Sequence, residues 1–363
     1  MRAAVIEAVG GPFEIVDVRI DSPGPGEVLI DVRASGLCRS DLHVATTDAG
    51  FPMPAVLGHE VAGIVAAVGE DVADVAVGQH VVTSPIHSCG TCRACLTGRP
   101  YQCARSSATS RAQGTTPRLS LGGRPLTQFI GVGGFAEQVL VHATNVVAVP
   151  EEIPFDRAAL LGCGVVTGAG AAVNTAGVRP GDTVAVLGCG GVGLNVIQGA
   201  ALAGAERIIA VDLDPAKLEL AQTFGATDTV DPAVGDSVAQ VHELTRGGVT
   251  HAFEAIGLKQ TSEQALAMLE IGGTAYLIGV HQPGRTIEVT PFGDLLGKQK
   301  GLRGVAMGST NLKVDIPMYA RLYLQGRFRL DELVSHRIGL GEIDRGYELL
   351  RAGGVARSVI TDF

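Results

Sequence analysis

Three features are missing from this 363-residue chain. Its 28 lysines and arginines are outnumbered by 37 aspartates and glutamates, so the net charge of −9 offers no electrostatic footprint for a nucleic-acid backbone. No uninterrupted apolar run reaches the ~18 residues of a membrane span, because Asn174, Asn195 and Gln198 interrupt the Gly/Ala-rich stretches. No secretory segment opens the chain, where Arg2 and Glu7 flank a short apolar run. We therefore expect a soluble, cytoplasmic protein that binds neither nucleic acid nor membrane.

Tryptophan is absent, and aromatic residues make up only 4% of the chain and charged residues 18%. By contrast, 46% of the residues are hydrophobic and 50 are glycines, a composition typical of a well-buried globular chain with many tight turns. At about 150 residues per domain, the length indicates two domains.

The apolar patterns differ between the two halves of the chain. Up to about residue 150 the runs are short, rich in Val and Ile, and bounded by Gly, Pro, Asp or Ser, which predicts a mostly β lobe. From residue 183 onward, strand-like runs alternate with helix-length segments, which predicts a parallel sheet with crossover helices. The predicted strands are residues 27–32, 60–68, 79–83, 135–149, 183–187, 207–211, 250–255 and 274–280. The predicted helices are residues 192–203, 215–224, 234–245 and 260–269.

Two further segments lie outside this alternation. A helix at 316–324 and short strands ending at 357–361 predict that the C-terminus completes the first lobe. Residues 104–128 run through Ser, Thr, Arg, Gly and Pro with little periodicity, which predicts a long surface loop with a functional or interfacial role.

Four of the seven cysteines lie close together and have the spacing of a metal site. Four thiolates spaced C-x2-C-x2-C-x7-C can complete a tetrahedral zinc shell on their own. A pair of disulfides is the alternative, and it is disfavoured in a long chain without a secretory segment. We therefore predict a structural zinc site at Cys89, Cys92, Cys95 and Cys103.

A second, dispersed set of ligands consists of Cys38, His59 and Cys163. Two thiolates and one imidazole leave the fourth tetrahedral position free for water or substrate, which is the arrangement of a catalytic zinc. The remaining cysteine, Cys189, has no ligand spacing, and we interpret it as a small filler residue.

A glycine-rich turn follows the apolar run at 183–187. Gly188, Gly190 and Gly193 form G-x-G-x-x-G at the entrance to a predicted helix, where the backbone can approach a pyrophosphate at the helix N-terminus. Asp212 follows nineteen residues after Gly193 and is placed to accept the adenosine ribose hydroxyls, which favours NAD over NADP.

Four further residues lie in the glycine-rich turn or shortly after Asp212. Gly191 and Val192 lie within the turn and belong to the expected cofactor site. Asp214 precedes Pro215 and is explained by helix capping. Lys217 is either a solvated helix residue or a ligand of the ribose.

These motifs resemble, in order and spacing, the zinc-dependent alcohol dehydrogenases of the medium-chain dehydrogenase/reductase family, over essentially the whole chain. The long loop resembles that of the animal-type, class III-like branch. The resemblance implies an α/β protein with a GroES-like, mostly β catalytic domain at residues 1–164 and 308–363. A Rossmann domain with a doubly wound parallel sheet would occupy residues 165–307. The matching segments are residues 36–43, 58–60 and 162–164, the four-cysteine lobe, the glycine-rich turn with Asp212, and the tail around Arg357.

The resemblance also implies catalytic roles. Ser40 would pass the alcohol proton to the cofactor ribose and His43 would pass it on to solvent, since a serine hydroxyl is too weak to act as the base. Glu60 would be a transient fifth zinc ligand or an electrostatic partner, and Asp41 would orient His59. Without the family pattern, Ser40 and His43 could be ordinary turn residues.

Further contacts to cofactor and substrate follow from the same resemblance. Arg39 and Arg357 would contact the pyrophosphate, although both could be surface charges. Val280 would contribute to the cofactor site and to an apolar channel for a primary aliphatic or aromatic alcohol or its aldehyde. The other channel residues would be Pro85, Phe129, Ile130 and Met307.

Three alternatives remain open at this point. A formaldehyde dehydrogenase acting on a thiol adduct needs a basic group, and Ser107 stands where the glutathione-dependent type has arginine, although Arg105 and Arg111 lie nearby. A non-enzymatic NAD- and zinc-binding protein would tolerate loss of Ser40 and His43. NAD could also be bound without exchange. We expect hydride transfer between an alcohol and NAD, two zinc ions per subunit, and a homodimer, with a tetramer as the alternative.

Overall fold

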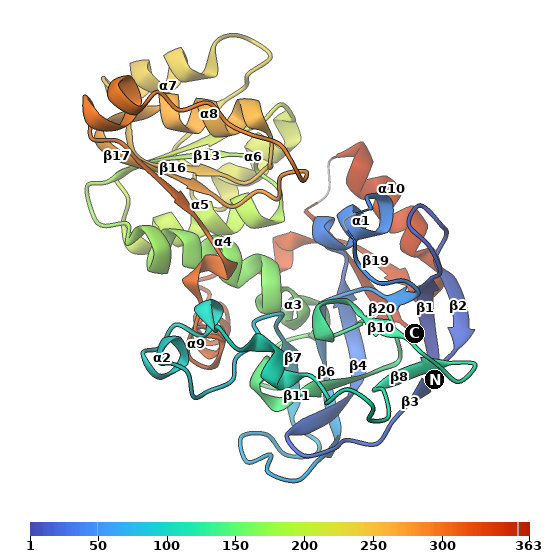
Figure 1. Cartoon of the computed structure of the whole chain (residues 1–363). Coiled ribbons are helices and arrows are strands. Elements are labelled where there is room, and N and C mark those ends of the chain that lie inside the picture. The colour runs from blue at the N-terminus through green and yellow to red at the C-terminus, as the bar shows by residue number, and fades with distance from the viewer. Residues whose placement is uncertain (49, 354–355) are drawn as a thin grey trace. The chain divides into compact units, whose positions relative to one another are not determined.

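The computed structural model describes residues 1–48, 50–353 and 356–363, and the chain forms two compact units. Unit 1 comprises Met1–Gly164 and Asn311–Phe363, and unit 2 comprises Val165–Thr310 (Figure 1). Each unit has its own buried apolar clusters. The architecture is α/β, as the sequence predicts.

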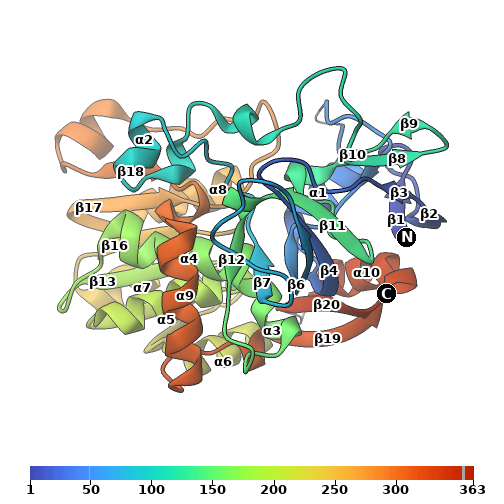
Figure 2. The same ribbon diagram turned by 90° about the horizontal axis from the view of Figure 1, so that it is seen from below.

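Unit 1 is built mainly from short strands in three sheets. The largest has the order β12-β7-β6-β4-β20-β19, and β11 also pairs with β4. Because β20 comes from the C-terminus and pairs with β4, the tail of the chain completes this sheet (Figure 2). The other two sheets are β10-β5-β1-β2 and β3-β8-β9. The strands of unit 1 are β1 (Arg2–Ile6), β2 (Glu14–Asp17), β3 (Arg19–Ile20), β4 (Glu27–Gly36), β5 (Ala55–Val56), β6 (Glu60–Val68), β7 (His80–Thr83), β8 (Leu119–Leu121), β9 (Arg124–Pro125), β10 (Thr127–Gln128), β11 (Gln138–His142), β12 (Val146–Ala148), β19 (Val334–Gly339) and β20 (Arg357–Asp362).

The helices of unit 1 differ from the sequence prediction in two places. The C-terminal helix predicted at 316–324 begins four residues earlier, at Leu312. Helix α10, which lies between β19 and β20, has no counterpart in the sequence analysis. The helices are α1 (Arg39–Thr46), α2 (Arg93–Leu96), α3 (Phe155–Leu160), α9 (Leu312–Leu324) and α10 (Ile343–Ala352).

Unit 2 is a doubly wound parallel sheet. Its order is β15-β14-β13-β16-β17-β18, and every neighbouring pair is parallel. Helices α4 and α5 lie on one face and α7 and α8 on the other (Figure 1). The chain reverses its winding direction between β13 and β16, and ligands of such sheets bind at the carboxyl ends of the strands at this switch point. The elements are β13 (Thr183–Leu187), β14 (Arg207–Val211), β15 (Asp228–Val230), β16 (Val249–Glu254), β17 (Leu269–Leu277), β18 (Gly301–Gly304), α4 (Val166–Gly170), α5 (Gly191–Ala203), α6 (Pro215–Thr223), α7 (Ser237–Thr245) and α8 (Lys259–Ala267).

Local capping explains where the helices of unit 2 begin and end. Asp214 accepts a hydrogen bond from the backbone N–H of Ala216 at 3.0 Å, directly before Pro215. The capping interpretation of Asp214 is therefore confirmed. Helix α5 ends at Gly204, which has φ 86° and so adopts the left-handed conformation that glycine tolerates best.

One helical segment, Phe155–Ala176, escaped the sequence analysis. It is 22 residues long and apolar enough to cross a membrane, but 89% of its most apolar window is buried inside the protein. It is therefore a core helix. Because it is apolar on all sides and rich in Gly and Ala, it has no helical periodicity to detect, and its π-helical turn at Leu161–Val165 further blurs the pattern.

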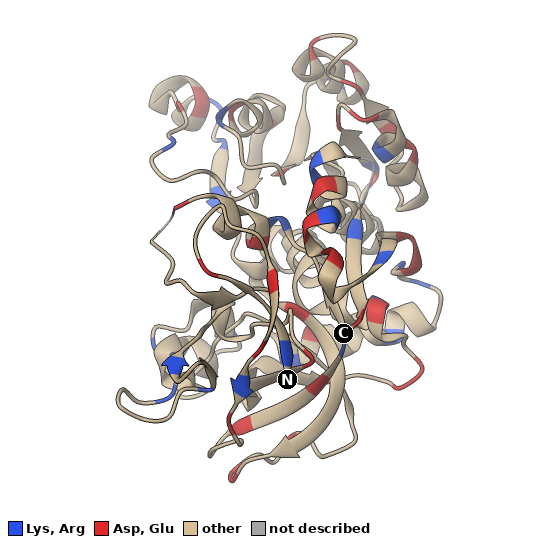
Figure 3. Ribbon diagram, turned by 90° about the vertical axis from the view of Figure 1, so that its right-hand side faces the viewer, with Lys and Arg blue, Asp and Glu red and all other residues tan. Residues whose placement is uncertain are grey.

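Basic and acidic residues are interspersed in both units (Figure 3). The net charge is −9, and the absence of a nucleic-acid partner stays a prediction.

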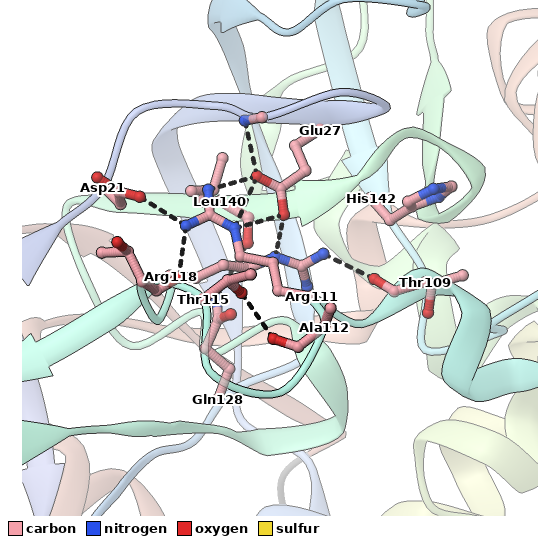
Figure 4. A network of polar contacts seen from close by, with 12 residues as sticks. Asp21, Glu27, Thr109, Arg111, Ala112, Thr115, Arg118, Gln128, Leu140 and His142 are labelled. Atoms are coloured by element: carbon pink, nitrogen blue, oxygen red, sulfur yellow. Dashed lines mark hydrogen bonds and ion pairs between the residues drawn. The ribbon is translucent and has the colours of Figure 1, made fainter.

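The segment at 104–128 is more ordered than the surface loop that the sequence predicts. It contains a 3-10 turn at Ser106–Thr109 and a short hairpin of β8 and β9. Two of its arginines meet the buried carboxylate of Glu27 at the start of β4 (Figure 4). Arg111 Nη2 lies 2.6 Å from Glu27 Oε2, and Arg118 Nε lies 2.7 Å from Glu27 Oε1.

Glu27 should make stability depend on pH. Burial acts to raise its pKa, but hydrogen bonds from Arg111, Gly24 and Arg118 prevail and lower the pKa from 4.5 to about 2. The carboxylate then contributes about 3 kcal/mol to the free energy of unfolding above pH 4.5, and this contribution is lost as the pH falls from 4.5 towards 2.

We predict that Glu27→Gln lowers the free energy of unfolding by about 3 kcal/mol at neutral pH, and that the deficit shrinks as the pH is lowered through 4.5. Urea unfolding of both proteins across this range is the measurement. Glu14→Gln, at an exposed position on β2, is the control. A deficit for Glu27→Gln that stays constant with pH would contradict this account.

Candidate active site

The four clustered cysteines form the first candidate metal site. Their sulfur atoms lie within 4.8 Å of one another, with Cys92 Sγ 3.5 Å from Cys95 Sγ and 3.9 Å from Cys103 Sγ. Ligand atoms at the corners of a zinc tetrahedron are about 3.3–3.8 Å apart, whereas a disulfide bond is ~2.05 Å long. All seven cysteines are free, so the disulfide alternative is wrong and the set fits zinc.

The environment of this cluster stabilises thiolates unevenly. Hydrogen bonding from Thr91 lowers the pKa of Cys89 to about 5, whereas burial beside the other sulfur atoms raises the pKa of Cys95 to about 12. The backbone N–H groups of Cys89 and Arg105 both donate to Cys103 Sγ, at 3.3 and 3.4 Å. Backbone donors thus offset part of the negative charge that four thiolates would gather.

The second candidate metal site brings together Cys38, His59, Glu60 and Cys163. One ligand atom of each lies within 4.8 Å of the others, and all four residues are buried. They come from separate elements of unit 1: Cys38 precedes α1, His59 and Glu60 stand at the start of β6, and Cys163 lies in the π-helical turn. His59 Nε2 lies 3.3 Å from Cys163 Sγ, a spacing that fits a tetrahedral zinc edge.

Asp41 fixes the orientation of His59. Its Oδ1 accepts from His59 Nδ1 at 3.0 Å and from the backbone N–H of Gly58 at 2.9 Å, and its Oδ2 accepts from the backbone N–H of Cys38 at 3.2 Å. The Asp41 side chain is fully buried. This bond leaves Nε2 as the free metal-binding nitrogen, so Asp41 takes the orienting position that the resemblance implied.

The buried thiols and imidazole influence one another's charge. A hydrogen bond from Cys163 lowers the pKa of Cys38, and the same contact raises the pKa of Cys163. Burial acts against a charged imidazole, but Asp41 and Cys38 prevail and raise the pKa of His59. A zinc ion at this set would therefore displace the protons that these directions leave on Cys163 and His59.

Glu60 and Arg357 form an ion pair beside this cluster. Arg357 Nε lies 3.4 Å from Glu60 Oε2, and both side chains are almost fully buried. Burial raises the pKa of Glu60 to about 7, against the attraction of Arg357. The pyrophosphate contact inferred for Arg357 stays a prediction, since its observed partner is Glu60.

The residues of the expected proton relay lie on α1. Ser40 and His43 are half-buried, and Arg39, at the start of the same helix, is exposed. Their catalytic and cofactor roles stay predictions.

An aromatic wall lies against His59. The ring of Phe129 is 5.6 Å from the His59 ring at 68°, and the ring of Phe51 is 5.2 Å from that of Phe129. Ile130, the next residue, has φ 45° and ψ 42°, a left-handed conformation that costs a β-branched residue about 1–2 kcal/mol. Such strain persists only where surrounding contacts hold the backbone in place.

The other expected channel residues are divided between the units. Pro85 is half-buried in unit 1, whereas Met307 and Val280 belong to unit 2. Met307 has φ 48°, and its sulfur lies 3.7 Å from Thr167 Oγ1. Val280 is 61% exposed.

The glycine-rich turn of unit 2 has the close approaches that require glycine. A Cβ at Gly193 would lie 1.8 Å from the carbonyl oxygen of Gly188, and Gly188 itself has φ 95°. The Asp212 carboxylate accepts from the backbone N–H of Cys189 at 2.8 Å and of Asp214 at 3.0 Å, which fixes it beside the turn. Gly190 caps α5, and Gly191 and Val192 begin it.

Two further residues, Cys189 and Lys217, lie in or near the glycine-rich turn. Cys189 is 1% exposed, as a filler residue should be. Lys217 Nζ is 4.0 Å from Asp214 Oδ2, and its ribose contact stays a prediction.

Sequence reasoning missed one carboxylate at the switch point. Glu254 ends β16 and is fully buried, and its Oε1 accepts from the backbone N–H groups of Ile256 and Gly257 at 2.9 and 2.7 Å. The available signal was an acidic residue at the end of an apolar strand and before a glycine. Glu254 fixes the loop that follows the strand.

Comparison with known proteins agrees with this geometry. Residues 24–151 match the alcohol dehydrogenase GroES-like domain, and residues 191–322 match the zinc-binding dehydrogenase family. The S-(hydroxymethyl)glutathione dehydrogenase of Synechocystis sp. is 38% identical over 99% of both chains. The NDMA-dependent alcohol dehydrogenase of Amycolatopsis methanolica is 40% identical over 99% of this chain and 98% of its own.

A solved structure matches equally well. The benzyl alcohol dehydrogenase of Acinetobacter calcoaceticus has a TM-score of 0.94 and 36% identity, with 100% of this chain and 99% of that chain covered. Fold and site thus define a zinc-dependent oxidoreductase with a dinucleotide-binding domain. The chain belongs to the zinc-binding alcohol dehydrogenases of the medium-chain family, in which NAD or NADP binding is a family property.

We predict that the two candidate metal sites can be emptied separately. Cys163→Ala should lose one zinc equivalent with little change in melting temperature, whereas Cys103→Ala should lose the other and melt at a clearly lower temperature, because zinc holds its lobe together. Elemental analysis of each purified variant, with a thermal melt, is the measurement. Cys189→Ala should keep the full metal content. Equal zinc content in all three variants would disprove both assignments.

Proposed function

We propose that the protein transfers hydride between a primary aliphatic or aromatic alcohol, or its aldehyde, and NAD. The observation that carries this proposal is the buried Cys38, His59 and Cys163 set, which supplies three zinc ligands and leaves one position for the substrate oxygen. The aromatic wall of Phe51 and Phe129 beside His59 supports an apolar substrate.

A zinc ion in this site supplies Lewis-acid chemistry that lowers the proton affinity of an alcohol oxygen. Side chains of the protein orient the zinc ligand His59 and carry the proton away. Asp41 holds His59 in the tautomer whose Nε2 faces the metal site. We assign Ser40 and His43 to carrying the alcohol proton away, Ser40 as a relay and His43 as the group that delivers it to solvent. Glu60 and Arg357 place a buried charge pair beside the ligands.

NAD rather than NADP is the proposed cofactor. The carboxylate of Asp212 stands at the end of β14, beside the glycine-rich turn, where it would accept ribose hydroxyls and repel a 2′-phosphate. We assign Arg39 and Arg357 to the pyrophosphate, and Lys217 and Val280 to further cofactor contacts. Pro85, Ile130 and Met307 complete the proposed substrate channel.

A second candidate function is oxidation of a thiol adduct of formaldehyde. It is favoured by the 38% identity to a relative named S-(hydroxymethyl)glutathione dehydrogenase. Against it, Arg111 is engaged by Asp21 and Glu27 and is not available to bind the adduct's carboxylate. Arg105 is exposed, and its Nη2 contacts Thr91 Oγ1 at 2.7 Å.

We predict that the zinc-loaded protein reduces NAD, seen as NADH absorbance, with benzyl alcohol and hexanol and without any thiol. Ser40→Ala should lower kcat by about 10²-fold with zinc content unchanged, because the proton loses its relay. Formaldehyde with and without thiols completes the panel. Activity confined to formaldehyde plus a thiol would establish the second candidate instead, and bound NAD that is reduced once without turnover would indicate a cofactor that does not exchange.

We further propose a cytoplasmic homodimer that forms through the edge of the unit 2 sheet. Strand β18 pairs with β17 along one side, and among the described residues no strand covers its other side. Leu302 on this strand is 37% exposed, and Phe292 and Leu296, in the turn before it, are 78% and 72% exposed. An uncovered edge flanked by apolar side chains is a template for pairing with a second copy about a two-fold axis.

We predict that Leu302→Lys converts the dimer to monomers, because a charge at the edge opposes strand pairing. Sedimentation velocity of the variant and of the unaltered protein is the measurement. Val234→Lys changes a 77% exposed apolar residue elsewhere in unit 2 and should leave the dimer intact. Four subunits in the unaltered protein would instead support the tetramer.

A further inference from the structure

His87 contacts two segments of unit 1 that lie 22 and 43 residues after it in the sequence. Its Nδ1 lies 2.8 Å from Thr109 Oγ1, in the 3-10 turn of the long segment at 104–128. Its Nε2 lies 2.9 Å from the carbonyl oxygen of Ile130, in the turn that carries the aromatic wall. Both nitrogen atoms of the half-buried ring are therefore engaged.

The Ile130 carbonyl fixes the direction of one of these hydrogen bonds. A carbonyl oxygen can only accept, so Nε2 of His87 carries a proton and donates to Ile130. The Thr109 hydroxyl also lies 2.9 Å from the carbonyl oxygen of Ser106, so its single proton is donated either to that oxygen or to Nδ1 of the neutral His87 ring. The His87 imidazole therefore links Thr109 to Ile130, and we call this link the His87 strut. Rotation of the ring would break both bonds.

The position of the Ile130 carbonyl affects the position of the neighbouring Phe129 ring. Ile130 adopts the strained left-handed conformation, and the neighbouring Phe129 packs edge-on against the zinc-ligand candidate His59. The same turn is closed by Gln128 Nε2, which donates to the carbonyl oxygens of Val132 and Leu140 at 3.0 and 3.1 Å. Together His87 and Gln128 keep the Phe129 ring in one place.

The other end of the strut is itself anchored. Arg118 Nη2 donates to the carbonyl oxygen of Thr109 at 2.7 Å, and Arg118 Nε pairs with Glu27 (Figure 4). A continuous series of polar contacts thus runs from the start of β4 through Arg118, Thr109 and His87 to Ile130. Each contact is buried or half-buried, where hydrogen bonds hold geometry best.

We propose that His87 is a positioning residue that sets the aromatic wall of the alcohol site, and so decides how well bulky alcohols bind. It touches neither zinc nor substrate. Its effect passes through the Ile130 carbonyl to Phe129. This inference rests on the proposed alcohol dehydrogenase function.

The test compares three substitutions. His87→Leu removes both hydrogen bonds at similar volume, His87→Gln keeps an amide donor that can reach the Ile130 carbonyl, and His142→Leu is the matched control. His142 is another half-buried histidine of unit 1, whose Nδ1 contacts Thr144 within its own turn. Each variant is assayed with NAD and ethanol, hexanol or benzyl alcohol. Zinc content and hydrogen exchange of the peptide covering residues 129–133 are measured in parallel.

We expect His87→Leu to raise KM for benzyl alcohol about tenfold with kcat nearly unchanged, because a wall that contacts ground state and transition state alike contributes uniform binding. Ethanol kinetics and zinc content should stay unchanged. Exchange should rise at residues 129–133, since Val132 and Gly133 donate to the Phe129 carbonyl oxygen. His87→Gln should restore most of the lost affinity, and His142→Leu should resemble the unaltered protein.

Other outcomes overturn the proposal. Equal loss for every alcohol, or unchanged exchange at residues 129–133 in His87→Leu, would show that His87 does not position the wall. If His87→Gln is as impaired as His87→Leu, the hydrogen bond to the Ile130 carbonyl oxygen is not the cause of the rise in KM. If His87→Leu does not fold, Thr109→Val tests the same strut from its other end. If the unaltered protein oxidises no alcohol, the proposed function fails, while the exchange comparison still decides whether His87 holds the turn.

Discussion

One buried carboxylate, that of Asp41, holds together the segments on which the metal centre depends. It accepts hydrogen bonds from the backbone at Cys38, from the backbone at Gly58 and from the imidazole of His59. These groups belong to the start of α1 and to the approach to β6, so a single side chain sets the spacing between two candidate metal ligands, Cys38 and His59. A carboxylate this deeply buried is stable only because each contact is a charge-assisted hydrogen bond.

Removing Asp41 would free both segments at once. It would also alter a region that contains four buried acidic side chains. Cys38, Cys163, Asp41 and Glu60 are all buried, and Arg357 and the imidazole of His59 lie close to them. Isolated buried charges cost several kcal/mol each, so these groups must be paired with one another or neutralised by protons. A zinc ion suits the sulfur and nitrogen donors and would replace protons on the thiols and the imidazole when it binds.

Sequence reasoning succeeded where local patterns determine local structure. In unit 2, strands β13, β14 and β16 and helices α5 to α8 were predicted to within a few residues, since β-branched runs and helix caps act over short distances. Strand β17 begins five residues before its predicted start, and the short strands β15 and β18 were missed. It failed for Phe155–Ala176, which is apolar on every side and has no period to detect. The ligand residues could be read from their types and order. Their environment could not, because the Glu60–Arg357 pair joins residues 297 positions apart and the His87–Ile130 contact joins residues 43 positions apart.

The arginines of the long segment show why residue type alone is a poor guide to ligand binding. Arg111 contacts Asp21 and Glu27 and also donates to the carbonyl oxygens of Ser22 and Thr116. To bind an external carboxylate, its guanidinium would have to leave all four partners, and Glu27 would keep only Arg118 and a backbone N–H in a buried position. An exchange of buried ion pairs for one exposed pair is unfavourable, because the carboxylate left behind loses its compensation. In this segment the half-buried side chains of Arg111 and Arg118 therefore hold the structure together, and among the arginines weighed for a thiol adduct only Arg105 is exposed.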